Sequence, residues 1–325
     1  MSNFVRRKLL LAMSTAVLSA FAAVGHAADY PNKPIRLIVT YPPGGGADIV
    51  ARLVAAKMAT ALGEQLIVEN RPGANGQIGA NVLARSAPDG YTVMLDATGF
   101  SINPNLYPSL PYKTSEFAPV SVLVKFPNLL VKNPQFAAKD VKALIDMVHR
   151  EPGKIAYASS GTGSVQHLAG ALFGSKIEGQ LMHIPYKGGG PALTDVAGGQ
   201  VPIMFANGAS ALPFIESGKV IPLATTGSVR GSALPNVPTM SEAGAPAMQA
   251  YEWNALFVPA GTPQAIIDKL AAVAHDAVND PLVHKQLIAM GGEPLGASPA
   301  ESAQFIADQM KTWKSVIAEN QIKPN

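Results

Sequence analysis

The chain has 325 residues, 48% of them hydrophobic and only 14% charged, so it can bury one large core or two ordinary ones. This composition excludes an intrinsically disordered protein. The first 27 residues hold three of the 25 basic residues and none of the 22 acidic ones, which leaves 22 of each sign. The remainder therefore lacks the basic excess of a nucleic-acid-binding protein. The absence of cysteine excludes disulfides, thiolate metal sites and a cysteine-linked lipid anchor.

Residues 1–27 have the three-part layout of a secretory signal peptide. A basic cluster at 6–8 precedes an apolar segment of roughly 15 residues, and small residues follow at Gly25 and Ala27. We predict cleavage after Ala27 and release into the periplasm. The apolar run is short for the ~20 residues of a membrane-spanning anchor. The arginine pair also fits twin-arginine export, but no feature indicates a cofactor inserted before export, so we favour the ordinary secretory route.

From Ile35 onward, strand-like runs alternate with helical patterns, which is typical of a parallel sheet covered by helices. The first series is expected to contain strands at 35–40, 65–70 and 91–97 and helices at 48–62 and 77–85. In the helix at 48–62, apolar residues recur at three- and four-residue spacing, and Gly63 is placed to end it.

A second series of the same kind follows the extended segment 117–134. Its expected elements are strands at 154–160, 181–187, 201–207 and 220–226, a helix at 140–150, and helices beginning at 165 and 191. Another strand is expected from 250, and helical patterns follow it. Thr262 with Pro263 predicts a cap followed by proline at the first helical position, and Ser298 to Glu301 is a capping box.

The extended segments 117–133 and 250–259 bracket the second series. A chain that crosses from one lobe to the other and returns gives two lobes joined by a two-strand hinge. We therefore predict an α/β protein in which each lobe is a mainly parallel sheet flanked by helices. Lobe 1 is expected to comprise 28–125 plus 252–325, and lobe 2 to comprise 126–251.

Four glycine-rich turns share one arrangement, in which an expected strand precedes the glycines and an expected helix follows them. The turns are "TYPPGGGADIV" (40–50), "RPGANGQIGA" (71–80), "SSGTGSVQHLAG" (159–170) and "PYKGGGPALTDV" (185–196). Glycine lets a ligand approach the backbone closely, and a helix start offers unpaired N–H groups and partial positive charge. Each turn is therefore a candidate anion site made of backbone, although glycine also punctuates ordinary strand-to-helix turns.

The turns lack the residues that bind nucleotides. A phosphate loop needs G-x-x-x-x-G-K-[ST], and a dinucleotide fingerprint needs G-x-G-x-x-G; neither pattern occurs in them. The two triple-glycine turns fall in different lobes. We therefore predict a ligand held between the lobes, with an anionic group at the helix starts.

Six segments in order, "YPPGGGAD", "VENRPGANGQIGA", "APDGYTVML", "ASSGTGSVQHLAGALF", "PYKGGGPALTDVAGGQV" and "FVPAGTP", resemble the Bug/TctC family of periplasmic solute receptors. The resemblance covers essentially the whole chain after the signal peptide. It implies a hinged, two-lobed periplasmic binding protein of the Venus flytrap type, which closes on a small carboxylate-bearing solute. Family members are the binding components of tripartite tricarboxylate transporters, so membrane transporter subunits are the implied partners.

The resemblance also implies ligand-binding residues, because the family grips a carboxylate with backbone amides, hydroxyls and ordered waters. The candidates are Tyr41, Pro42, Gly44, Gly45, Ala47 and Asp48 in the first lobe and Ser159, Ser160, Thr162, Gly163, Ser164, His167, Tyr186, Lys187, Gly188 and Gly189 in the second. One position departs from the family: Ala206 stands where aspartate often follows the phenylalanine. We expect from this change that the ligand presents no cationic group there, which disfavours an amino acid.

An enzyme is the competing class, because Ser164 and His167 are close enough in sequence to act as a nucleophile and base. No G-x-S-x-G elbow occurs, and the spacing also fits a helix cap and its first-turn neighbour. Asp48 is more typical of a residue that complements a helix dipole than of a base, and Lys187 is either an anion contact or a solvated lysine. We expect no enzymatic activity, and no metal or cofactor, because no metal-ligand spacing occurs among the six histidines.

The chemical class of the ligand beyond its carboxylate stays open. Tyr41, Phe100 and Phe205 are candidates for lining a cleft that accepts an aromatic acid, but each also fits core or hinge packing. Aliphatic and aromatic acids are both compatible with the sequence. We expect the protein to be a monomer. A periplasmic sensor module without a transport role would have the same fold and is the alternative function.

Overall fold

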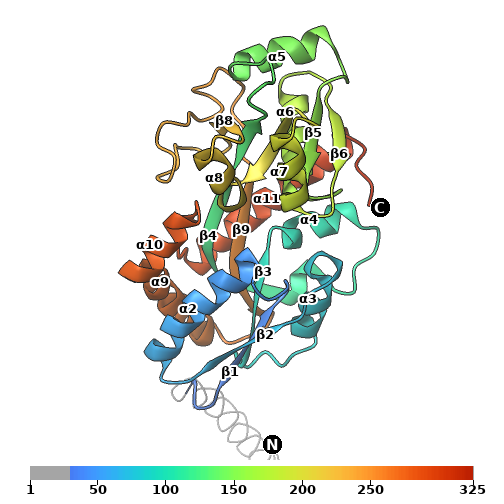
Figure 1. The fold of residues 1–325 in the computed structure, drawn as a ribbon. Helices are drawn as coiled ribbons and strands as arrows, with labels where there is room; N and C mark the ends of the chain where they lie inside the picture. Colours follow the sequence, from blue (N-terminus) through green and yellow to red (C-terminus); the bar gives the residue numbers. More distant parts are fainter. Residues whose placement is uncertain (1–29, 325) are drawn as a thin grey trace, which may run out of the picture.

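Two parallel β-sheets are joined by a pair of antiparallel strands in a computed structural model that describes residues 30–324 (Figure 1). The predicted signal peptide lies outside these residues. The strands follow the order β2-β1-β3-β9-β4-β7-β5-β6, with β8 and β10 added alongside β4. Pairing is parallel within β2-β1-β3 and within β7-β5-β6, and antiparallel in the middle.

The elements of the first lobe come from both ends of the chain. Before the first crossing they are β1 (Ile35–Val39), α2 (Gly46–Leu62), β2 (Leu66–Asn70), η1 (Ala74–Gly76), α3 (Gln77–Ala84), β3 (Thr92–Ala97), α4 (Gly99–Leu106) and η2 (Thr114–Glu116). After the second crossing they are α9 (Gln264–Asn279), α10 (Pro281–Ala289), β10 (Glu293–Pro294) and α11 (Pro299–Glu319).

The second lobe lies between the crossings. Its elements are α5 (Val141–Arg150), β5 (Ala156–Ser159), α6 (Val165–Lys176), β6 (Met182–Pro185), α7 (Gly189–Ala197), β7 (Ile203–Asn207), α8 (Gly208–Glu216) and β8 (Ile221–Thr225). The predicted α/β class, with a mainly parallel sheet in each lobe, is confirmed.

The hinge consists of β4 (Phe117–Lys132) and β9 (Tyr251–Pro259). The two strands pair from Phe117 opposite Pro259 to Pro127 opposite Tyr251. From the next residue onward β4 pairs with β7, so one strand belongs to both sheets. The buried side chain of Asn128 marks the transfer, because its amide donates to the Ala250 carbonyl at 3.2 Å.

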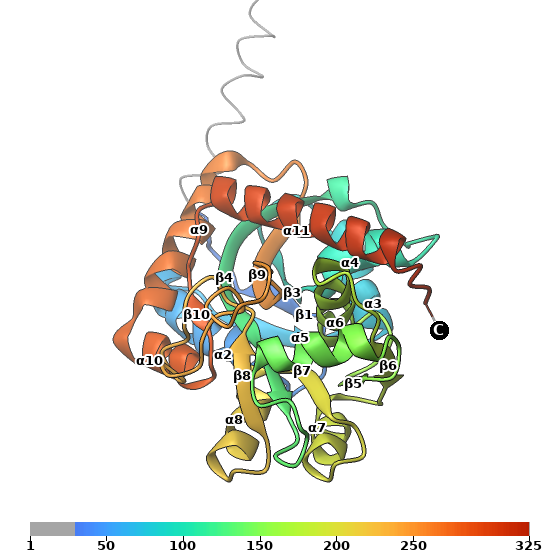
Figure 2. The ribbon, with the colours of Figure 1, turned by 90° about the horizontal axis from the view of Figure 1, so that it is seen from above.

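Hydrophobic cores lie on both faces of each sheet. Along β1, Leu37 and Val39 face the core beneath α2 and α9, whereas Ile38 faces the core beneath α3 and α4. A strand buried on both faces explains why the segment "IRLIV" is apolar at every position except Arg36. Helix α11 crosses between the lobes: Ile306 packs in the first, and Trp313 packs against α6 in the second (Figure 2).

Several predicted helix boundaries need correction. Helix α2 begins at Gly46 instead of residue 48, and α7 begins at Gly189 instead of residue 191. Pro263 is the N-cap of α9 instead of its first helical residue. The capping box is confirmed, because the Ser298 hydroxyl accepts from the Glu301 N–H at 3.3 Å. None of the helices among residues 30–324 is both long and apolar enough to cross a membrane.

Two helices beside the hinge, α4 and α8, are absent from the predictions. Each is short, at eight and nine residues, and each contains an internal proline. Proline is unfavourable in a helix interior, and a two-turn segment shows too little periodicity to be recognised. Both helices begin directly at the carboxyl end of a strand, which places their N-termini at the mouth between the lobes.

Candidate functional site

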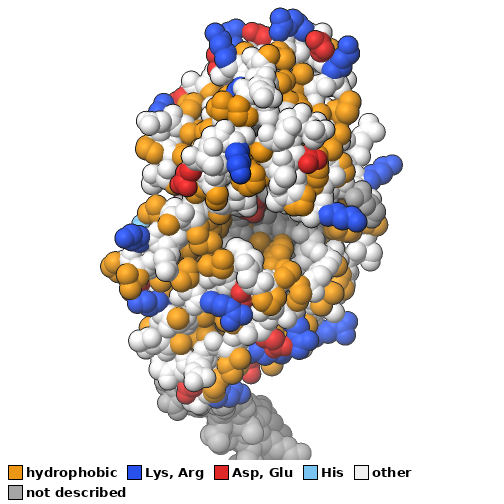
Figure 3. All heavy atoms as spheres, viewed as in Figure 1, with side chains coloured by type: hydrophobic (Ala, Val, Ile, Leu, Met, Phe, Trp, Pro, Cys, Tyr) orange, Lys and Arg blue, Asp and Glu red, His pale blue; other side chains and the backbone are white. Residues whose placement is uncertain are grey.

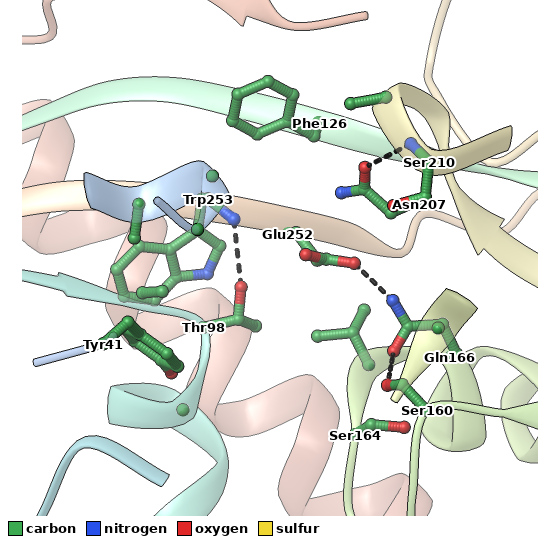
Figure 4. A pocket seen from close by; sticks show the side chains of 18 of the residues that line it. Tyr41, Thr98, Phe126, Ser160, Ser164, Gln166, Asn207, Ser210, Glu252 and Trp253 are labelled. Atoms are coloured by element: carbon green, nitrogen blue, oxygen red, sulfur yellow. Dashed lines mark hydrogen bonds between the residues drawn. The ribbon is translucent and has the colours of Figure 1, made fainter. Parts of the chain in front are cut away.

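A cavity of about 600 Å³ lies between the two lobes. Figure 3 shows the hollow between the two halves of the molecule, and Figure 4 shows side chains that line it. The N-terminal ends of five helices, α2, α4, α6, α7 and α8, contribute residues to its wall. The hinge contributes Phe126, Glu252, Trp253 and Asn254.

The first-lobe wall is the turn before α2. Tyr41, Pro42, Gly45, Gly46 and Ala47 line the cavity. The N-cap Gly45 has no side chain to satisfy the first N–H groups of the helix, so those donors are free for a ligand.

Asp48 holds this turn in place without lining the cavity. One carboxylate oxygen accepts from the Gly44 N–H at 2.9 Å and from Arg52 Nε at 3.0 Å, and the other accepts from Asn70 Nδ2 at 2.8 Å. These partners, Arg52 first, lower the pKa of Asp48 to about 2. The carboxylate is therefore a structural anion that fixes the turn.

The second-lobe wall is the turn before α6, where Ser160, Gly163 and Ser164 line the cavity. Ser164 is the N-cap: its hydroxyl accepts from the His167 N–H at 3.3 Å and donates to the Gly161 carbonyl at 2.7 Å. At Gly163, φ is 77° and an added Cβ would lie 2.4 Å from Leu106 Cδ2 of α4. Glycine is favoured here because the backbone is left-handed and because Leu106 of the first lobe packs against this turn.

Two histidines support the second-lobe turn from behind. His167 Nδ1 accepts from the Gly163 N–H at 3.0 Å, and its ring stacks on His183 with centroids 3.6 Å apart. His183 Nε2 is hydrogen-bonded to Ser159 Oγ at 2.7 Å. Burial, with a smaller contribution from His183, lowers the pKa of His167 to about 3, and burial lowers the pKa of His183 to about 4. Both rings are neutral at physiological pH.

Ser164 and His167 are not arranged as a nucleophile and base. The Nδ1 atom of His167 is occupied by a backbone donor, and the Ser164 hydroxyl donates to a backbone carbonyl. Among the hydrogen bonds of residues 30–324, none joins the Ser164 hydroxyl to the imidazole ring. The geometry favours a helix cap over nucleophilic catalysis.

The turn before α7 contributes less than its sequence suggests. Gly189 lines the cavity, but Lys187 is exposed and lies outside the lining. The Tyr186 hydroxyl donates to Asp195 Oδ2 at 2.7 Å, and Gly188 stands at φ 117° behind the wall.

The structure therefore brings about half of the predicted site residues to one cavity. Those that line it are Tyr41, Pro42, Gly45, Ala47, Ser160, Gly163, Ser164 and Gly189. Those that lie outside the lining are Gly44, Asp48, Ser159, Thr162, His167, Tyr186, Lys187, Gly188 and Ala206. Ala206 is fully buried in a hydrophobic cluster of the second lobe, and Phe100 and Phe205 are likewise core residues.

Polar lining residues near the hinge were missed by sequence analysis. Thr98 Oγ1 accepts from the Trp253 N–H at 2.9 Å, which ties the start of α4 to β9. Gln166, Asn207 and Glu252 converge at the other side of the hinge (Figure 4). In the sequence, Glu252 lies between the apolar residues Tyr251 and Trp253 of an expected strand. An acidic residue at such a position was the one signal that could have identified it as part of the site.

No group of three or more histidine, aspartate or glutamate side chains among residues 30–324 is placed to hold a metal ion. The cavity wall is built from backbone, hydroxyl, amide and apolar groups, with one carboxylate. These groups suit an organic ligand with an anionic end, because helix starts supply N–H donors and the apolar part of the wall covers carbon.

Comparison with known proteins gives concordant results. The family model described as "Tripartite tricarboxylate transporter family receptor" (TctC) matches residues 50–322. The Protein BugT of Bordetella pertussis is 37% identical over 320 residues, which cover 97% of this chain and 98% of BugT.

Solved structures agree. A protein described as a periplasmic transporter is 40% identical, with a TM-score of 0.77 over 90% of this chain and 99% of its own. A protein of R. palustris, solved with adipate, is 31% identical, with a TM-score of 0.79 over 91% of this chain and 100% of its own. The chain therefore belongs to the Bug/TctC family of tripartite tricarboxylate transporter receptors.

Proposed function

We propose that this receptor captures a small carboxylate-bearing solute between its two lobes and delivers it to a tripartite tricarboxylate-type transporter in the membrane. The observation that carries the proposal is the convergence of helix starts from both lobes on one cavity. Helix N-termini stabilise anions through free N–H groups and partial positive charge. The adipate bound by the R. palustris relative is an anion of this kind.

The lining explains why backbone is the anion ligand. Among the described residues that line the cavity, none is lysine, arginine or histidine. A carboxylate that leaves water must replace its hydrogen bonds. The N–H groups of Gly46 and Ala47 at the start of α2, and of Val165 and Gln166 at the start of α6, are placed to do so. Binding, and not catalysis, is the function that this chemistry serves.

Closure about the hinge is the proposed mechanism. We divide the chain as lobe 1 (28–125 plus 252–325) and lobe 2 (126–251), with β4 and β9 as the hinge. A ligand that touches both walls favours the closed form by its differential contacts. The closed form is the species that the transporter would recognise, and export to the periplasm by the predicted signal peptide places the receptor on that side of the membrane.

A thermal-shift screen tests the proposal. The panel contains mono-, di- and tricarboxylates, aliphatic and aromatic, each paired with its neutral carboxamide. A ligand at 100 times its dissociation constant adds about 2.7 kcal/mol to the free energy of unfolding. We expect at least one acid to raise the melting temperature and its amide to leave it unchanged. Equal shifts by acid and amide, or none across the panel, contradict the proposal.

A further inference from the structure

Glu252 is a carboxylate in a cavity whose other features favour anions. It is the second residue of the hinge strand β9 and stands opposite Phe126 of β4. Its side chain lines the cavity beside the second lobe (Figure 4). No ion pair among residues 30–324 includes it.

The neighbours of Glu252 are oriented as donors. Ser160 Oγ donates to Gln166 Oε1 at 2.6 Å, which turns the amide nitrogen of Gln166 toward Glu252, and that nitrogen donates to Glu252 Oε1. Asn207 Oδ1 accepts from the Ser210 N–H at 3.4 Å, and the Asn207 amide acts to lower the pKa of Glu252. Both amides are thus held from their far ends, so that Glu252 acts as an acceptor.

Two amide donors do not neutralise a carboxylate. Burial raises the pKa of Glu252 above its usual value, and the amides of Asn207 and Gln166 offset this rise only in part. An ionised carboxylate accepts about four hydrogen bonds, so acceptor capacity remains on its cavity side. A plain dicarboxylate in this cavity would be repelled by Glu252, because like charges in a low dielectric are unfavourable.

We infer that the ligand is an amino-carboxylate, whose ammonium group binds Glu252 while a carboxylate binds the helix starts. This inference rests on the proposed function. Glu252 is then the specificity-determining residue of the cavity. This inference reverses the expectation drawn from Ala206, because the acidic group comes from the hinge strand instead of β7. Ala206 is fully buried, so its side chain has no surface that could contact a ligand.

The experiment compares matched acids on two variants. The probes are glutarate, glutamate and 5-aminopentanoate, and adipate with 2-aminoadipate, measured by calorimetry at pH 7. Glu252→Gln removes the charge and keeps the shape. Glu319→Gln removes the same charge from the exposed end of α11 and serves as the control.

We expect the wild type to bind at least one amino member tenfold or more tightly than its plain partner. E252Q should lose at least tenfold toward that amino acid and hold or gain affinity for the plain acid, while E319Q matches the wild type. If plain acids bind as well as amino acids, or E252Q leaves their ratio unchanged, the inference is overturned and the proposed function stands.

A pH series separates the remaining outcome. If affinity for plain dicarboxylates rises about tenfold per unit as pH falls from 7 to 5, and E252Q abolishes this dependence, Glu252 binds a proton instead of an ammonium. That result also overturns the inference. If no acid of either kind binds, the proposed function itself fails.

Discussion

The turns before α2 and α7 both carry three glycines after a tyrosine, yet only the first forms a large part of the cavity wall. The first turn, residues 40–50, contributes six lining residues, whereas the second, residues 185–196, contributes Gly189 and Leu193. Sheet order explains the difference. Helix α7 follows the edge strand β6, whereas α2 follows β1, which is closer to the hinge.

The same dependence on strand position holds around the rest of the cavity. The segments after the two edge strands supply few lining residues: Asn75 after β2, and Gly189 and Leu193 after β6. Strands nearer the hinge open into helices whose N-termini line the wall, as α4 does after β3 and α8 after β7. Strand position, and not glycine content, thus decides which turn reaches the ligand, in keeping with ligand sites at the carboxyl ends of parallel strands.

The largest expected effect on ligand affinity comes from placing the same side chain in each turn. Gly46 and Gly189 are the first residues of α2 and α7, both line the cavity, and a Cβ at either meets no atom within 4 Å. Gly46→Val should weaken carboxylate binding by roughly 100-fold, about 2.7 kcal/mol. Gly189→Val should weaken it by no more than about threefold. Calorimetry with a ligand from the screen measures both.

Gly190→Val is the matched control, because Gly190 also has open space around its Cβ but lies outside the lining. It should bind like the wild type. Equal losses for Gly46→Val and Gly189→Val would show that the two turns contribute equally and would contradict the rule of strand position.

A second contrast concerns one buried titratable group in each lobe. The pKa of the group in the first lobe is raised, and the pKa of the group in the second lobe is lowered. In the first lobe, Asp96 accepts from Thr40 Oγ1 at 2.6 Å, and burial raises the pKa of its carboxyl to about 7. In the second lobe, burial lowers the pKa of His167 to about 3. Both shifts favour the neutral form, so pH acts on the two lobes with opposite sign.

Asp96 binds its proton more tightly in the folded state, so its stabilising contribution is full below pH 4 and is lost as pH rises to 7. His167 binds its proton less tightly when folded, so its contribution is present above pH 6.5 and is lost as pH falls toward 3. Asp96→Asn should therefore steepen the rise of stability with pH between 4 and 6.5, by up to roughly 4 kcal/mol across the Asp96 window. His167→Asn should flatten it.

Urea unfolding at several pH values measures these slopes. An asparagine at position 96 keeps an acceptor for Thr40, and one at position 167 keeps an acceptor for the Gly163 N–H. Slopes that move in the same direction in both variants would contradict the assignment of opposite signs.

A smaller effect is expected from the caps of α6 and α11, because only one of them faces the cavity. Ser164→Ala and Ser298→Ala each remove an N-cap hydroxyl, which should lower the free energy of unfolding by about 1 kcal/mol. Ser164→Ala should also weaken ligand binding several-fold, whereas Ser298→Ala should leave affinity unchanged. A loss of affinity in Ser298→Ala would show that the effect of Ser164→Ala is not local to the cavity.

Elements whose hydrophobic periodicity extends over many residues could be predicted from the sequence. Parts of the site that depend on residues brought together by the fold could not. Alternating strands and helices, the hinge segments and the α2 and α6 turns were predictable, because each follows from local pattern. Helices α4 and α8 were not, since short length and an internal proline hide their periodicity. The roles of Glu252 and Gln166 depend on residues 86 positions apart in the chain. No single-sequence pattern encodes such a pair.

Lys187 gives the smallest expected effect and the sharpest test of the α7 turn. Its side chain is exposed and outside the lining, so at physiological salt its attraction for a ligand anion is largely screened. Lys187→Ala should change affinity by less than about twofold, as should Lys219→Ala, which removes an exposed lysine before β8. A tenfold loss for Lys187→Ala alone would mean that closure carries the α7 turn onto the ligand. Both triple-glycine turns would then form one clamp, although they contribute unequally here.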